Sequence, residues 1–149
     1  MRRAIDWSEI EYFEPKDFDD PDAPGSWELM DPQSIILLND LRRATGLPII
    51  PHNQYGVRGC VCMRADGHSE NSLHYAKHPD GCSAIDWHFD TDADPRAQAL
   101  AVLQSGFSGI GFYYDWCYGQ KLAIGFHTDL RSRPQLWRRE NGRYTYLLR

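Results

Sequence analysis

The segment from Asp31 to Gly46 constrains the fold most, because it carries both ends and the buried face of one helix. Asp31 can cap the first free backbone N–H groups, and Pro32 suits the first helical position. Gly46 followed by Pro48 ends the helix. Its apolar residues recur at spacings of three and four, as in a helix with one buried face: Ile35, Ile36, Leu37, Leu38, Leu41 and Ala44.

The rest of the chain predicts one more helix and then mainly strands. Asp94-Pro95 repeats the helix-start signal, and Gly106 ends a segment whose buried face we expect to comprise Ala97, Leu100, Ala101 and Leu103. Asn141-Gly142 is a strong signal for a tight hairpin. Short apolar segments predict strands at 47–50, 57–63, 83–89, 110–114, 122–130, 135–139 and 144–148. Helices early and antiparallel strands late indicate an α+β fold, a small antiparallel sheet with helices packed on one side.

The length of 149 residues suits one compact domain, 1–149. Residues 1–30 are rich in acidic, aromatic and turn-forming residues, so we predict an irregular N-terminal arm. Phe13 and Phe18 should attach this arm to the core, since aromatic residues are too frequent in it for a free tail.

Composition excludes several classes of partner. The formal net charge of −5 argues against nucleic acid. Basic residues near the C-terminus are expected to lie on solvated hairpin faces or, alternatively, to contact an anionic ligand: Arg131, Arg133, Arg138, Arg139, Arg143 and Arg149. No apolar run approaches the length of a membrane span. The N-terminus lacks the apolar segment of a secretory signal, so we expect synthesis in the cytoplasm and, for action outside, release by another agent.

The four cysteines, Cys60, Cys62, Cys82 and Cys117, match no common zinc-finger spacing. We expect them to be reduced and mostly buried. An oxidised pair or a second metal site remains the alternative.

Two histidines and an aspartate are the candidate metal ligands. His74 lies in the long polar loop 64–83, and loops of this length in a small domain are usually functional. Asp86 and His127 lie within apolar strand segments, where a buried polar group needs a partner. Together with His74 they can fill three corners of a zinc tetrahedron and leave the fourth to water. The alternative is that each is an ordinary hydrogen-bonded core residue.

The motifs in which these residues occur resemble the zinc D-alanyl-D-alanine metallopeptidases, which share a fold with the hedgehog signalling domain. That family is similar in having S-x-H, then A-x-D, then a late H-x-D, here Ser72-x-His74, Ala84-x-Asp86 and His127-x-Asp129. Its G-Y-R turn resembles Gly56-Val57-Arg58. The resemblance covers most of the chain and implies Zn²⁺ held by His74, Asp86 and His127.

The resemblance also implies roles around the metal. Arg58 would bind a substrate carboxylate or carbonyl, or else form a structural salt bridge. Ser72 would hydrogen-bond near the first ligand or the substrate, or simply cap the loop. Asp129 would orient a metal ligand through a hydrogen bond without binding the metal itself, or else face solvent. Tyr113, Tyr114, Trp116 and Tyr118 flank the approach to His127 and form either a substrate wall or ordinary packing.

Two features depart from the family pattern. Eleven residues separate His74 from Asp86, where the family usually has six, so 75–81 is an enlarged loop. The general base, a Glu three residues or a His two residues before the last ligand in the family, is replaced by Ile124 and Gly125. Proton transfer would then fall to one of Asp129, Glu70, His68 or His78.

The expected function is a zinc-dependent peptidase that hydrolyses peptidoglycan peptides next to a D-amino acid. Its partner would be the stem peptide, with no nucleic acid and no membrane insertion, and the protein would be a monomer. The likeness suggests a phage or prophage lysis or virion protein acting on the cell wall. The alternative is a non-catalytic metal-binding or virion-associated domain on the same fold, and a metal-free binding module is a third class.

Overall fold

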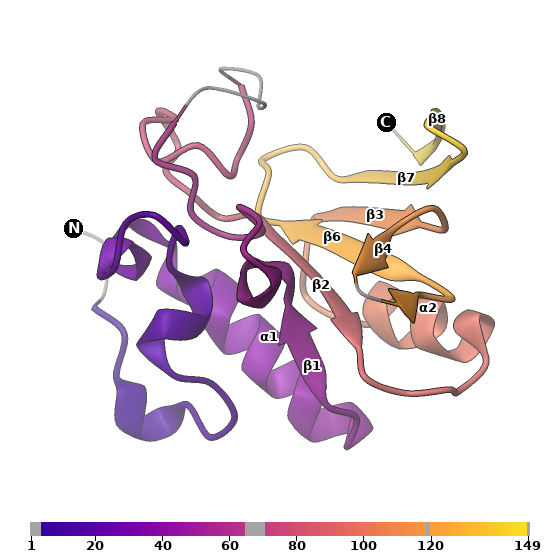
Figure 1. Cartoon of the computed structure of the whole chain (residues 1–149), viewed down its shortest axis with the longest axis horizontal. Helices are drawn as coiled ribbons and strands as arrows, with labels where there is room; N and C mark the ends of the chain where they lie inside the picture. The colour runs from indigo at the N-terminus through magenta and orange to yellow at the C-terminus, as the bar shows by residue number, and fades with distance from the viewer. Residues whose placement is uncertain (1–3, 65–70, 119, 149) are drawn as a thin grey trace.

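A computed structural model describes residues 4–64, 71–118 and 120–148. The α+β prediction is confirmed: two α-helices accompany a six-stranded, mostly antiparallel sheet (Figure 1). The helices are α1 (Pro32–Thr45) and α2 (Pro95–Leu103), and four short 3-10 helices are η1 (Trp7–Glu9), η2 (Pro15–Phe18), η3 (Ser26–Leu29) and η4 (His52–Tyr55). The sheet contains β1 (Ile49–Pro51), β2 (Ile85–Phe89), β3 (Gly109–Tyr113), β6 (Gly125–Asp129), β7 (Gln135–Glu140) and β8 (Arg143–Leu148).

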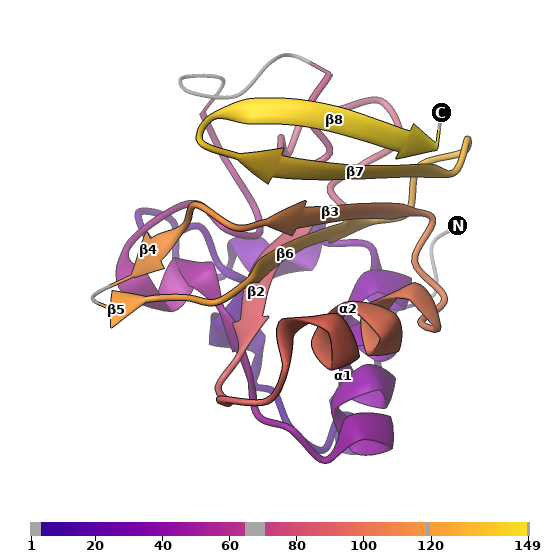
Figure 2. The same cartoon turned by 90° about the vertical axis from the view of Figure 1, so that its right-hand side faces the viewer.

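The strand order is β1-β2-β6-β3-β7-β8, and every pair is antiparallel except β3 with β7. A separate small hairpin pairs β4 (Cys117–Tyr118) with β5 (Gln120–Lys121). Figure 2 shows both α-helices on one side of the sheet and this small hairpin on the other. One side of the sheet therefore carries no α-helix in the described ranges and is covered in part by this hairpin.

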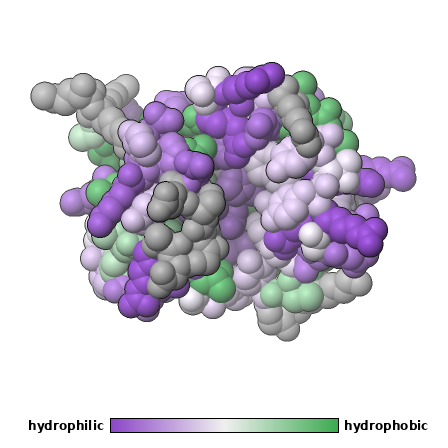
Figure 3. All heavy atoms as spheres, turned by 90° about the horizontal axis from the view of Figure 1, so that it is seen from above, coloured by the Kyte–Doolittle hydropathy of each residue, from purple (hydrophilic) through white to green (hydrophobic). Residues whose placement is uncertain are grey.

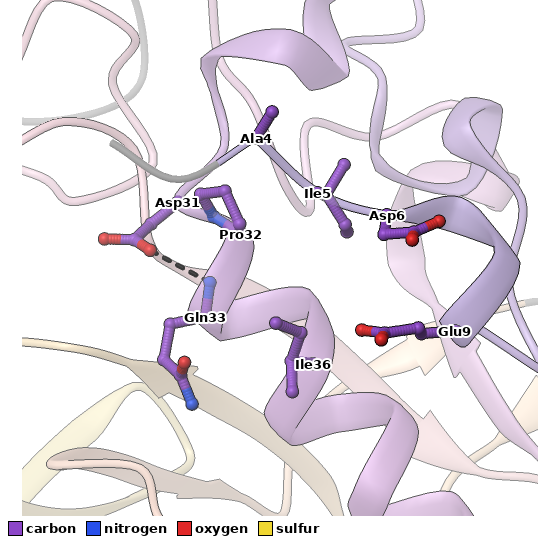
Figure 4. Close-up of a pocket in the computed structure, with 8 residues that line it drawn as sticks. All are labelled: Ala4, Ile5, Asp6, Glu9, Asp31, Pro32, Gln33 and Ile36. Carbon is purple, nitrogen blue, oxygen red and sulfur yellow. Dashed lines mark hydrogen bonds between the residues drawn. The ribbon is translucent and has the colours of Figure 1, made fainter. Parts of the chain in front are cut away.

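Helix α1 follows the sequence prediction, whereas the N-terminal arm, predicted to be irregular, contains the short helices η1, η2 and η3. Asp31 accepts the backbone N–H of Gln33 at 3.0 Å (Figure 4). Gly46 ends α1 with a φ of 67°. Phe13 and Phe18 are buried, so the arm is attached to the core as expected. Ala44 is exposed, contrary to prediction, because the buried face of α1 ends at Leu41.

Three other predictions fail. Ala97 is exposed, and Leu100 and Leu103 are 57% and 45% exposed, since α2 is rotated so that Gln98 and Val102, one turn apart, face inward. Segment 57–63 forms no strand; its contacts are loop hydrogen bonds and one isolated bridge. The late strands are not all antiparallel, because β7 runs parallel to β3. The Asn141-Gly142 turn is confirmed, with φ of 50° and 74° at its two residues.

The sheet has two chemically different faces. Alternate residues of β2, β3 and β6 point into the apolar core with α1: Ile85, Trp87, Phe89, Ile110, Phe112 and Phe126. The residues between them point to the opposite face, because side chains alternate along a strand. There, cross-strand pairing forms one continuous row: Asp86, His127, Gly111, Trp137 and Tyr146. The predicted strand ligands thus share one face.

Candidate metal centre

His74, Asp86 and His127 come together as the sequence motifs predict, and their arrangement could hold a metal ion. Asp86 Oδ1 lies 2.8 Å from His127 Nδ1 and 3.3 Å from His74 Nε2, and the two imidazole nitrogens are 3.2 Å apart. Asp86 and His127 are directly opposite on β2 and β6, so the sheet itself fixes two corners of this triangle.

Backbone contacts place His74, the one ligand that lies outside the sheet. Its Nδ1 is 3.0 Å from the carbonyl oxygen of Cys60, which fixes a proton there and turns Nε2 towards the other ligands. The backbone N–H of Cys62 donates to the carbonyl of His74, and the N–H of Ala84 to that of Leu73. Ser72 Oγ accepts the backbone N–H of His74 at 3.3 Å. These hydrogen bonds hold His74 in place although the enlarged loop, 75–81, directly follows it.

Asp129 supports His127 from the side away from the other ligands. Its Oδ2 is 2.8 Å from His127 Nε2, so Nδ1 is the nitrogen left for a metal. Arg131 donates to Asp129 from Nε at 2.8 Å and also from Nη2. Asp129 is fully buried with both oxygens engaged. This arrangement suits the orienting role and leaves no carboxylate oxygen for proton transfer.

The charges of the cluster are strongly coupled. Burial lowers the pKa of His127, but its hydrogen bonds to Asp129 and Asp86 outweigh burial and raise it to about 9. Burial raises the pKa of Asp86, but His74 and His127 hold it well below its usual range. Burial also raises the pKa of Asp129, but its hydrogen bonds with Arg131 and His127 outweigh burial and lower it. A proton on His127 thus occupies the place that a metal ion would take.

A cleft of about 690 Å³ opens beside His127. Figure 3 shows a hollow lined by hydrophilic side chains on the face that carries the loop and the β7–β8 hairpin. The cleft is lined by Asp31, Asn71, Ser72, Leu73, His78, Asp80, Ser83, His127, Asp129, Leu130, Arg131, Ser132 and Trp137. The cleft therefore brings three predicted site residues, Ser72, His78 and Asp129, next to the candidate metal ligand His127.

His78 lies in this cleft, half-buried, and its Nδ1 accepts the backbone N–H of Asp80 at 3.1 Å. Its Nε2 then carries the proton of the neutral ring. Glu70 and His68, the other candidates for proton transfer, lie outside the described residues.

Arg58 is placed differently from the expectation that the resemblance raised. It pairs with Asp20 at 3.3 Å and with Asp22 at 2.5 Å, and it does not line the cleft. Asp20 is buried and also accepts the backbone N–H of Met63. In this structure Arg58 ties the N-terminal arm to the loop, which is the structural alternative for this residue.

Two residues that shape the site, Gly111 on β3 and Trp137 on β7, were not predicted from the sequence as site residues. Trp137 packs on His127 with ring centroids 5.3 Å apart, and Arg131 lies over Trp137 at 4.6 Å. A Cβ at Gly111 would lie 2.6 Å from the Trp137 ring. Two signals could have found them: glycines within strands mark close approach, and His127, Asp129 and Arg131 alternate onto one face.

A second pair of imidazole rings, His52 and His88, lies on the same face of the sheet, with His88 two residues after Asp86 on β2. His52 Nε2 lies 2.9 Å from His88 Nδ1, and the His52 ring packs on Tyr118 at 3.9 Å. Nδ1 of His52 has no hydrogen-bond partner among the described residues. Burial lowers the pKa of His52 to about 3, so this ring is neutral. Tyr118 and Trp116 thus pack as the aromatic cover of a buried polar pair.

The cysteines are mostly buried, as predicted: Cys60, Cys62 and Cys82 are inside and Cys117 is exposed. No helix in the described ranges is long and apolar enough to cross a membrane. Comparison with known proteins adds no family: no family model, no curated protein and no solved structure matches this chain.

Proposed function

We propose that this protein is a zinc-dependent peptidase that hydrolyses peptidoglycan peptides next to a D-amino acid. The observation that carries the proposal is the convergence of two imidazole nitrogens and one carboxylate oxygen beside a polar cleft. The choice of peptide rests on the S-x-H, A-x-D and H-x-D motifs that hold these ligands.

The ligand geometry fits zinc. Bonds of 2.0–2.1 Å in a tetrahedron place ligand atoms about 3.3 Å apart. Two of the three distances here, 3.2 and 3.3 Å, match this spacing, and the third, 2.8 Å, is that of the hydrogen bond between His127 and Asp86. Three protein ligands leave one position open, as catalytic zinc sites do. When bound there, zinc supplies an acidified water and polarises a carbonyl group.

The chain's own residues would prepare the substrate and move protons. Asp129 and Cys60 fix the tautomers of the two histidines, so the ligand set needs little rearrangement. Of the candidates for proton transfer in the described part of the chain, His78 is the one that lines the cleft without an ion pair to hold it. We therefore assign proton transfer to or from the substrate to His78.

Peptidoglycan digestion tests this function. The purified protein, loaded with zinc, should release new peptide ends from peptidoglycan, and a chelator should abolish the release. Asp86→Asn should remove the activity and zinc together, while Asp40→Asn, a change at an exposed ion pair on α1, should leave both intact. A folded, zinc-loaded protein that releases no chelator-sensitive ends would count against the proposal.

A second candidate function is a metal-binding domain without catalysis. It is favoured by Ile124 and Gly125, which precede His127 and cannot move a proton, and by the full engagement of Asp129. For this function, removing zinc should lower the melting temperature, while His78→Gln should have no measurable effect on any reaction. For the peptidase, His78→Gln should lower kcat and alter its pH profile while zinc content stays unchanged.

A further inference from the structure

We infer that Arg131, and not Arg58, anchors a carboxylate group of the ligand that occupies the cleft. This inference rests on the proposed function, which it deepens by naming an anionic, carboxylate-bearing peptide as the substrate class. Arg131 lines the cleft, and its side chain is 26% exposed. Arg58 is turned to the N-terminal arm by Asp20 and Asp22.

The hydrogen bonds of Arg131 leave donors for a ligand. A guanidinium carries five N–H groups. Nε and Nη2 donate to Asp129, and Nη1 donates to Gln135. One N–H on each terminal nitrogen is accepted by no described residue, and two N–H groups are what a carboxylate needs for two-point binding.

The guanidinium is also held rigidly. Its flat face lies 4.6 Å from the centre of the Trp137 ring, and Trp137 itself is buried. Asp129, which takes the inner edge, is fully buried. A planar cation fixed on one face and one edge loses little freedom when it binds a ligand at the remaining edge. Arg131 is therefore prepared for a planar anion.

Arg131 is the one Arg or Lys among the described residues that line the cleft. Asp31 and Asp80 also line it, and their carboxylates make the cleft away from Arg131 and His127 unfavourable for an anion. Asp129 is compensated by Arg131 itself. His127 adjoins Asp129, so a carboxylate held at Arg131 lies close to the metal ligands. A peptide bound this way would present a nearby bond to the centre.

Binding of a small probe to the metal-free protein tests the inference without catalysis. The probes are N-acetyl-D-alanine and its amide, which differ in the carboxylate alone, and binding is followed by tryptophan fluorescence and NMR shifts. Hydrogen bonds to charged groups are worth about 1.5–3 kcal/mol, so the acid should bind about 10-fold to 100-fold more tightly. Equal binding of the two probes would overturn the inference.

Substitutions test whether Arg131 is the residue that causes the preference for the acid over the amide. Arg131→Gln should reduce the acid-to-amide ratio to below about 2-fold, and Arg131→Lys should restore part of it. Because Arg131→Gln also releases Asp129, Ser132→Asp gives an independent check: it adds a negative charge at the exposed rim of the cleft and leaves the Arg131–Asp129 pair in place. It should lower the ratio, while Ser132→Asn should not. Arg58→Gln should keep the full ratio, and loss of the ratio in that variant would overturn the inference.

Hydrolysis by the zinc-loaded protein separates this inference from the function itself. Nα-acetyl-D-Ala-D-Ala should be cleaved with a higher kcat/KM than its amide, and the ratio within one variant cancels any difference in metal content. No cleavage of either peptide or of peptidoglycan, with the binding preference intact, would reject the peptidase and support the anion site. Cleavage of both peptides at equal kcat/KM, together with equal binding of the two probes, would reject the anion site and support the peptidase.

Discussion

His127 and Trp137 lie on strands that are separated by β3, yet their ring centroids are only 5.3 Å apart. Two strand spacings span about 9.6 Å, so the rings meet only because Gly111 stands between them without a side chain. The indole leans across this gap and covers the ligand. The glycine in β3 is thus part of the candidate metal centre although it carries no functional group.

Gly111→Ala should therefore loosen both the sheet and the site. The added Cβ would lie 2.6 Å from the Trp137 ring and 2.7 Å from the Tyr113 ring, neither of which can easily move. We expect a loss of unfolding free energy of about 1–3 kcal/mol and weaker zinc binding. Chemical denaturation and chelator competition measure these. The control is Gly106→Ala, whose Cβ would have the flexible Leu37 side chain as its nearest neighbour. An unchanged zinc affinity in Gly111→Ala would show that Trp137 does not support His127.

Asp129→Asn should weaken zinc binding without removing a ligand. The carboxylate at His127 Nε2 orients the ring and raises its basicity, and loss of such a partner typically costs about 10-fold to 100-fold in metal affinity. Competition with a chromophoric chelator gives the constant. Asp115→Asn is the matched control, because Asp115 forms a comparable 2.9 Å pair with Arg139 away from the ligands. Equal zinc affinities for the two variants would contradict the orienting role.

Zinc should compete with a proton on His127. The pKa of His127 in the metal-free protein is raised to about 9, chiefly by its bonds to Asp129 and Asp86, which overcome burial. Below that pH a metal ion must displace one proton, so the apparent affinity should rise about tenfold per pH unit up to about pH 9. Calorimetry in buffers of different ionisation heat counts the protons. Release of no proton at pH 7 would mean that His127 is neutral before the metal arrives.

The same shift predicts how the metal-free fold responds to alkali. A folded pKa above the unfolded value of about 6.5 gives stability that is complete below pH 6.5 and lost as the pH rises towards 9. Metal-free protein should therefore be less stable at pH 9 than at pH 6.5 by up to about 3 kcal/mol. Asp129→Asn should flatten this dependence, which denaturation at several pH values can show.

Local signals in the sequence predicted much of the fold. The two Asp-Pro helix starts, Gly46 and the Asn141-Gly142 turn each fix backbone geometry within a few residues, and the structure bears them out. The rotation of α2 could not be read in this way. Gln98 faces inward because its side chain donates to the carbonyl of Ala93, a contact that hydrophobic spacing does not reveal.

The candidate site was predictable where motif and strand geometry coincide. Asp86 and His127 fall opposite each other by strand pairing, and His74 is brought in by loop bonds to Cys60 and Cys62. The surroundings of Arg58 depended on long-range contacts with Asp20 and Asp22, which no local pattern encodes. Arg131 and Trp137 likewise required the parallel pairing of β3 with β7, which places β7 beside the site.

His52 should make the protein sensitive to acid. It is fully buried against His88 and Tyr118, and burial lowers its pKa to about 3, below the unfolded value of about 6.5. A depressed histidine pKa means that the unfolded chain binds the proton first, so stability is complete above pH 6.5 and falls as the pH drops. The loss from this residue is about 3 kcal/mol at pH 4.5.

The test compares the native protein with His52→Gln by denaturation between pH 7.5 and 4.5, both without metal. The variant should be less stable at pH 7.5, because a buried hydrogen bond and ring packing are lost. Its stability should then fall less steeply with acid, so that the difference between the two proteins shrinks or reverses by pH 4.5. Titrating groups that do not contact His52 are common to both, so their effects cancel in this difference, whereas His88, which is hydrogen-bonded to His52, contributes to it together with His52. Parallel curves would show that His52 does not need to be neutral in the fold.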